Sequence, residues 1–167
     1  MTATAIDIFM KNHRTIRKAL MTLDRALLMR TPSSPIVAKN MATYLDLELR
    51  EYWGSEERWI FRPLAATGAD AAGVVAEMEN EHRDLEARLA EFKTLTQCPA
   101  AGGLNELIRE KGVALVKEFL HHMFLEEEVG FVLAEERLGR ARLTEIADQV
   151  VLLEKTGLEL EEPAAID

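Results

Sequence analysis

Residues 119–133 read Phe-Leu-His-His-Met-Phe-Leu-Glu-Glu-Glu-Val-Gly-Phe-Val-Leu, a stretch that sets polar residues into an apolar helical stripe. Steps of three and four residues give the stripe Leu115, Phe119, His122, Glu126, Val129 and Leu133. His122 and Glu126 are four residues apart, so both side chains point toward one spot on one helix face. Burying such groups without partners costs several kcal/mol. The stretch therefore predicts a core helix whose polar residues meet partners from other helices.

Stretches rich in Pro, Gly and Ser divide the rest of the chain into helical segments. Four long helices are predicted at 4–29, 36–64, 70–95 and 104–138, and a shorter one at 144–155. Thr4 and Asp7 have the spacing of a capping box at the first start, and Gly139 ends the fourth helix. Because two of the three main connections are short, we predict an all-α, antiparallel up-down four-helix bundle over 1–140. Residues 141–167 would add the short C-terminal helix and an acidic tail.

Composition narrows the possible partners. The chain has 167 residues, a formal net charge of −9 and one cysteine, Cys98. The acidic balance argues against nucleic acid, and no apolar run is long enough to cross a membrane. A single cysteine excludes an internal disulfide, and the N-terminus lacks the pattern of a signal peptide. We expect one cytoplasmic domain, and the sequence leaves a homodimer open.

The inward stripes of the other three long helices contain polar residues too. Stepping along the first helix gives Phe9, His13, Ile16, Leu20, Leu23 and Leu27. The second helix gives Met41, Leu45, Glu48, Tyr52, Glu56 and Trp59, and the third gives Val75, Met78, His82, Leu85, Leu89 and Phe92. A small rotation of the second helix would turn Leu49 inward in place of Glu48, and a register shift would substitute Trp53 and Glu57 for Tyr52 and Glu56. At about 1.5 Å per residue, the polar positions come to similar heights along the bundle.

Imidazoles and carboxylates that converge from several helices are how bundles build dinuclear iron or manganese sites. The candidate ligands are His13, Tyr52, Glu56, His82, Glu86, His122 and Glu126. Iron, as a pair, is the expected cofactor, and manganese or zinc could substitute. Residues 51–61 can also be laid over 121–131, which aligns Glu56 with Glu126, Phe61 with Phe131, and Tyr52 with His122.

At these motifs the chain resembles the hemerythrin and HHE cation-binding family. The motifs are Asn12-His13-Arg14, Glu81-His82-Arg83-Asp84-Leu85, the run from His122 to Glu127, and the run from Glu56 to Pro63. The resemblance covers roughly residues 4–138 and implies two irons. It further implies that Glu56 and Glu126 bridge them, that His13 serves one iron, and that His82 and His122 serve the other.

Two positions depart from the family pattern. Tyr52 replaces a histidine expected four residues before Glu56, and Glu86 replaces a second histidine of the third helix. Tyr52 could ligate as a phenolate or hydrogen-bond near the site. Oxygen donors favour the ferric state, so reversible O2 carriage is not expected.

The predicted function is a non-heme di-iron protein that binds or senses O2, NO or peroxide, or stores iron. One alternative is a di-iron oxidase or peroxidase-type enzyme. Another is a metal-free structural bundle, and iron donation to iron–sulfur clusters ranks lowest.

Overall fold

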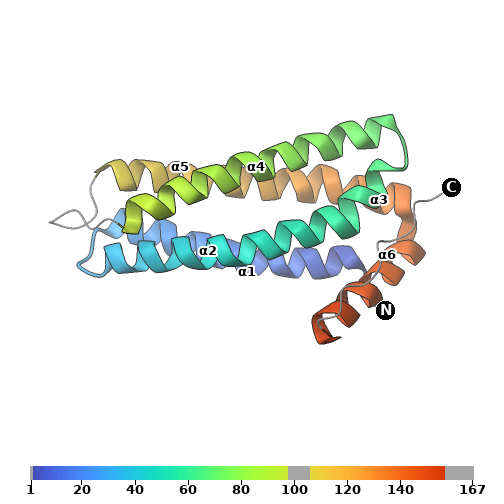
Figure 1. The fold of residues 1–167 in the computed structure, drawn as a ribbon, viewed down its shortest axis with the longest axis horizontal. Coiled ribbons are helices and arrows are strands. Elements are labelled where there is room, and N and C mark those ends of the chain that lie inside the picture. Colours follow the sequence, from blue (N-terminus) through green and yellow to red (C-terminus); the bar gives the residue numbers. More distant parts are fainter. Residues whose placement is uncertain (1, 98–105, 157–167) are drawn as a thin grey trace.

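The computed structural model describes residues 2–97 and 106–156, and within it the described residues form helices and their connections. The long helices are α1 (Ala5–Met29), α2 (Ser34–Glu56), α4 (Ala69–Gln97), α5 (Glu106–Leu125) and α6 (Phe131–Thr156). Two π-helical turns, η1 (Glu57–Phe61) and η2 (Glu126–Gly130), extend α2 and α5, and the short α3 (Arg62–Ala65) follows η1. Figure 1 shows α1, α2, α4 and α5 side by side along the long axis of the molecule.

Local sequence signals explain where the helices begin and end. The predicted capping box is present, with Asp7 N–H donating to Thr4 Oγ1 and Thr4 N–H donating to Asp7 Oδ2 at 2.7 Å. α1 ends where Arg30 adopts a left-handed conformation (φ 50°). Pro35 stands in the first turn of α2, where its missing N–H costs nothing.

Gly139 ends one helical stretch, as predicted, and a second stretch follows it at once. Its φ of 73° is not helical, and α6 consists of two helices joined across a kink at this glycine. Residues 144–155, predicted as a short helix, lie in the second of them. Figure 1 shows that part of α6 turning across the end of the bundle that also holds the N-terminus, and its Leu143, Ile146 and Val150 are buried there. The predicted acidic tail and nearly all of the loop at 97–103 lie outside the described residues.

The core is apolar toward one end and polar in the middle. Leucines and phenylalanines fill the end near the α1–α2 turn: Leu20, Leu23, Leu27, Leu45, Leu89 and Phe92 are all buried. At Gly112 of α5 the helices approach so closely that an added Cβ would lie 2.6 Å from Leu27 Cδ1 and 2.8 Å from Phe92 Cε2. Such packing fixes the spacing of the helices and so the separation of the polar residues further along.

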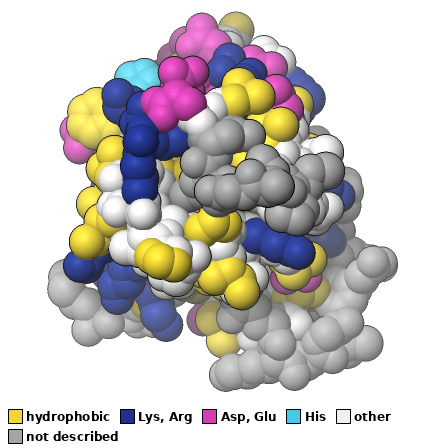
Figure 2. Space-filling view, turned by 90° about the vertical axis from the view of Figure 1, so that its left-hand side faces the viewer, with side chains coloured by type: hydrophobic (Ala, Val, Ile, Leu, Met, Phe, Trp, Pro, Cys, Tyr) yellow, Lys and Arg dark blue, Asp and Glu magenta, His cyan; other side chains and the backbone are white. Residues whose placement is uncertain are grey.

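The surface carries charges of both signs. Figure 2 looks at the end of the bundle on the left of Figure 1, and Lys and Arg side chains there alternate with Asp, Glu and apolar ones. In the described parts of the chain, no helix combines the length and the apolar character needed to cross a membrane.

Candidate metal centre

Three histidines from three helices surround one buried carboxylate. Glu126 Oε1 lies 2.9 Å from Nε2 of both His82 and His122, and Glu126 Oε2 lies 3.1 Å from His13 Nε2. Glu56, on α2, completes the cluster and lies 3.7 Å from His82 Nε2. Both carboxylates are fully buried, and each histidine is no more than 2% exposed. These groups form two triads that share Glu126, namely His82–His122–Glu126 and His13–Glu56–Glu126, and within each triad the ligand atoms lie within 4.8 Å of one another.

The two carboxylates stand at the only two π-helical turns among the described residues. Glu56 is the last residue of α2 before η1, and Glu126 is the first residue of η2. A π turn takes one more residue than an α turn, so it shifts the residues that follow relative to the helix face. As a result two consecutive glutamates can serve one site. Glu56 and Glu126 face its centre, whereas the residues that follow them, Glu57 and Glu127, reach its rim.

Each histidine is held from behind by a carboxylate at Nδ1. His13 Nδ1 lies 2.8 Å from Glu127 Oε1, His82 Nδ1 lies 2.6 Å from Glu57 Oε1, and His122 Nδ1 lies 2.7 Å from Glu81 Oε2. Since a carboxylate only accepts, each Nδ1 carries the hydrogen and donates it. A carboxylate at the far nitrogen fixes the tautomer and ring orientation of a metal-binding histidine and raises its basicity.

Aromatic rings pack on the histidines. Trp53 stacks on His82, with ring centroids 4.8 Å apart, and Phe119 stacks on Trp53 at 5.8 Å. Phe61 stacks on His82 at 5.9 Å, and Phe131 stacks on His13 at 5.4 Å. These buried rings limit rotation of the imidazoles and keep water away from them.

The structure gives a reason for the sequence overlay of residues 51–61 on residues 121–131. Glu57 and Phe61, four residues apart, hold and stack on His82, and Glu127 and Phe131 do the same for His13. The two halves differ at the aligned pair of Tyr52 and His122. His122 Nε2 lies against Glu126, whereas the Tyr52 hydroxyl donates a 3.0 Å hydrogen bond to Glu56 Oε1. One triad is therefore richer in nitrogen and the other richer in oxygen.

The two buried carboxylates have opposite protonation preferences. Burial raises the pKa of Glu126, but hydrogen bonds from His122, His13 and His82 outweigh it and hold that pKa well below its usual range. Burial, and then the negative charge of Glu126, raise the pKa of Glu56 well above its usual range. Of the two, Glu126 is therefore the carboxyl group that ionises more readily.

A comparison with protein-family profiles bears on this geometry. The profile of the hemerythrin HHE cation-binding domain matches residues 4–134. The chain belongs to the hemerythrin HHE cation-binding family. No curated protein and no solved structure gave a significant match. Within this hemerythrin-family chain, the matched region contains α1 through η2, and therefore all members of the polar cluster.

The donor set of the hemerythrin-family chain fits a metal cation. Four atoms in the cluster are buried without an acceptable hydrogen-bond partner: His13 Nε2, His122 Nε2, Glu56 Oε2 and Glu126 Oε2. When His13 and His122 are neutral and donate from Nδ1, the Nε2 atom of each presents a lone pair, in place of a hydrogen, to a carboxylate oxygen that also carries lone pairs. Facing acceptors repel, and a cation among them turns that repulsion into coordination. Imidazole nitrogen and carboxylate oxygen suit iron, zinc and manganese.

The structure gathers six of the seven predicted ligands and leaves one outside. His13, Tyr52, Glu56, His82, His122 and Glu126 are brought together. Glu86 does not join them, since its side chain is 46% exposed and its Oε1 lies 3.7 Å from Arg50 Nε. The α4 positions that face inward around it are Leu85 and Leu89, so Glu86 lies one position to the side.

Helix α2 is rotated relative to the predicted stripe. Leu49 is buried and Glu48 is exposed, as in the alternative considered above, and both Tyr52 and Trp53 are buried. Glu56 faces the centre, whereas the side chain of Glu57 is 35% exposed and reaches His82 from outside. In η2 the predicted inward position of Val129 is wrong, because the π turn places Gly130, and Phe131 after it, in the core instead.

The sequence did not predict that three carboxylates, Glu57, Glu81 and Glu127, accept hydrogen bonds from Nδ1 of the histidines. Glu127 accepts hydrogen bonds from His13 Nδ1 and from Arg17 Nη2, the latter at 3.1 Å. The available signal was the doubled glutamate, Glu56-Glu57 and Glu126-Glu127, which recurs at both π turns. Glu81 had no comparable signal, because it lies within the regular helix α4 and is not part of a doubled glutamate.

Proposed function

We propose that this chain is a non-heme di-iron protein of the hemerythrin family that binds or reacts with a small oxidant, O2, NO or peroxide. One observation carries the proposal: two buried ligand triads share Glu126, and their unpaired nitrogen and oxygen atoms face one another. His82, His122 and Glu126 would hold one metal, and His13, Glu56 and Glu126 the other. When bound, iron would supply the electrons and the coordination position for the small ligand.

The protein's own residues shape that chemistry in three ways. Glu57, Glu81 and Glu127 hold the imidazoles with Nε2 toward the centre. The buried rings around His13 and His82 exclude water, which strengthens every charge interaction inside. The Tyr52 hydroxyl keeps a proton 3.0 Å from Glu56 Oε1, since burial and then the charge of Glu56 raise the pKa of the phenol well above its usual range.

A matched pair of variants tests the proposal. His122→Ala removes a central imidazole, whereas His121→Ala removes its exposed neighbour on the same helix. We expect His121→Ala to retain the wild-type iron content after purification without chelator, and His122→Ala to lose iron and melt lower, because metal binding and folding are linked. Equal iron contents in the two variants would contradict the assignment.

A second candidate function is a di-iron oxidase or peroxidase-type enzyme, and the composition of the His13–Glu56–Glu126 triad favours it. This triad has one imidazole against two carboxylates, with a phenol next to them. Hard anionic donors stabilise the ferric state, which suits an oxidising site better than reversible O2 carriage. Steady turnover of peroxide with an added reductant would separate this enzyme from a binding protein.

A further inference from the structure

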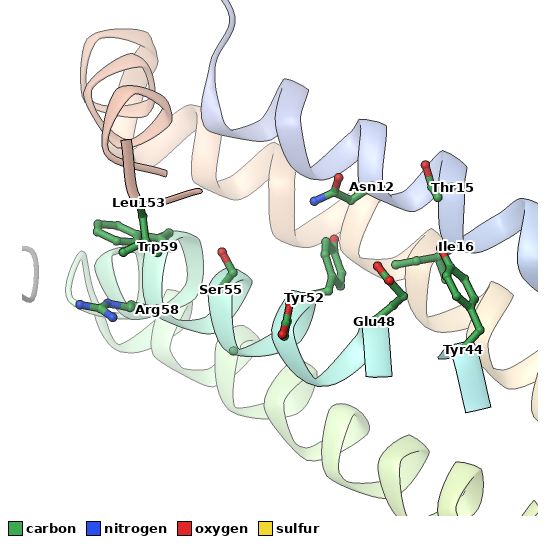
Figure 3. A pocket seen from close by; sticks show the side chains of 12 residues that line it. Asn12, Thr15, Ile16, Tyr44, Glu48, Tyr52, Ser55, Arg58, Trp59 and Leu153 are labelled. Atoms are coloured by element: carbon green, nitrogen blue, oxygen red, sulfur yellow. The ribbon is translucent and has the colours of Figure 1, made fainter. Parts of the chain in front are cut away.

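A groove runs along the outside of the proposed centre, between α1 and α2. It has a volume of about 800 Å³ and reaches Leu153 of α6 at one end. Figure 3 shows its lining, with Asn12 and Thr15 on α1 facing Tyr52, Ser55 and Trp59 from α2 and η1. Most of these side chains carry a hydrogen-bonding group, so the groove favours a hydrophilic guest.

Tyr52 separates this groove from the metal centre. It lines the groove, its hydroxyl donates to Glu56, and its ring centroid lies 5.5 Å from that of His13. Tyr52 thus contacts both the polar space and the ligand cluster.

Stacked aromatic rings cover two of the three histidines. On the α4 and α5 side, Trp53 and Phe61 cover His82 and Phe119 backs Trp53, and all three are buried. Phe131 covers His13 in the same way. On the Tyr52 side, by contrast, a cavity with polar walls reaches the cluster's edge.

The lining indicates what kind of molecule suits the groove. Asn12, Thr15 and Ser55 supply hydrogen-bonding groups, and Glu48, Glu51 and Arg58 supply charges of both signs, so the lining favours no single charge on a guest. A small neutral molecule that accepts and donates hydrogen bonds fits these conditions, whereas O2 and NO lack that capacity.

We propose that the α1–α2 groove is the entry route for hydrogen peroxide to the metal centre. The Tyr52 ring lies at the inner end of this route and moves aside to admit the molecule. The inference rests on the proposed di-iron function and narrows its ligand to peroxide. In the reaction that would follow, one H2O2 accepts two electrons from two ferrous ions and two protons, and leaves as two molecules of water.

Two glycines provide a matched test. Gly54 lines the groove and Gly73 lies on α4 away from it, and an added Cβ at either position meets no atom within 4 Å. Gly54→Phe therefore adds a large side chain at the groove from a Cβ that meets no neighbour, and Gly73→Phe makes the same change elsewhere. Thr15→Trp fills the groove from the α1 side.

The first readout uses metal-free protein. The chain's two tyrosines, Tyr44 and Tyr52, both line the groove. Hydroxyl radicals from photolysed peroxide, mapped by mass spectrometry, should label both less in Gly54→Phe and Thr15→Trp than in Gly73→Phe. This readout depends on the groove alone, so it stands even if the protein holds no metal.

The second readout is the rate constant for oxidation of the ferrous-loaded protein by peroxide. We expect it to fall about tenfold or more in Gly54→Phe and Thr15→Trp, at unchanged iron content, and to match wild type in Gly73→Phe. Wild-type rates in both filled variants would overturn the entry route while leaving the di-iron function in place. Absence of iron from the wild-type protein would instead overturn the function.

Discussion

Replacing Glu127 by glutamine isolates the contribution of one supporting carboxylate. Glu127 Oε1 lies 2.8 Å from His13 Nδ1 and 3.1 Å from Arg17 Nη2, and its side chain is 18% exposed. The amide keeps the shape but loses the charge that makes His13 basic. It can also turn its NH2 group toward Nδ1, which would favour the tautomer with the hydrogen on Nε2.

The expected loss of metal affinity in Glu127→Gln follows from the number of histidines that Glu127 contacts. Only His13 among the three histidines contacts Glu127, so one metal position weakens and the other does not. Loss of such a supporting carboxylate lowers metal affinity by about 10- to 100-fold, which corresponds to about 1.4–2.7 kcal/mol. Glu128→Gln is the matched control, because Glu128 is the exposed next residue of η2.

A competition titration against a coloured chelator would measure this effect. Wild type and Glu128→Gln should give the same two binding steps, and Glu127→Gln should retain one step and weaken the other. The reasoning is refuted if Glu127→Gln titrates like wild type, or if both steps weaken equally.

The remaining predictions address packing, pH and the phenol. Gly112→Ala should destabilise the protein by about 1–3 kcal/mol, because its Cβ meets buried Leu27 and Phe92, whereas Gly73→Ala should stabilise it by up to about 1 kcal/mol; urea titrations measure both. Metal-free protein should melt lower as the pH rises from about 6 to about 8. Burial lowers the pKa of His82, but hydrogen bonds to Glu126 and Glu57 outweigh it and raise that pKa above 6.5, so its stabilising protonation is lost as pH rises. The buried Glu56, whose pKa is raised from 4.5, acts in the same direction, and thermal melts in chelator at several pH values would show a flat or rising trend if this is wrong. Tyr52→Phe should leave the visible spectrum of the ferric protein nearly unchanged, since the phenol hydrogen-bonds Glu56; loss of a strong visible band would show that it ligates instead.

The spacing of apolar residues along the chain predicted the helices and most of the residues in the buried polar cluster. Steps of three and four residues identified His13, His82 and His122 as inward residues, because each interrupts an apolar stripe within a regular α-helix. The capping box at Thr4 and Asp7 gave the start of α1 for a similarly local reason.

The errors fall where the backbone leaves α-helical geometry or where packing sets the rotation. The π turn after Glu126 adds a residue that a fixed period cannot anticipate, so Val129 was placed inward although it is 42% exposed. Glu48 and Leu49 are adjacent, and only contacts with the other helices decide which one faces the core. The roles of Glu81 and Glu127 depend on contacts between helices that one sequence does not encode locally.

The most direct test of the convergent metal centre is anomalous X-ray diffraction from crystals of iron-loaded protein, measured on both sides of the iron absorption edge. Two iron peaks should lie on either side of Glu126, one next to His82 and His122 and the other next to His13 and Glu56. An iron-loaded crystal without a peak among these side chains would contradict the account.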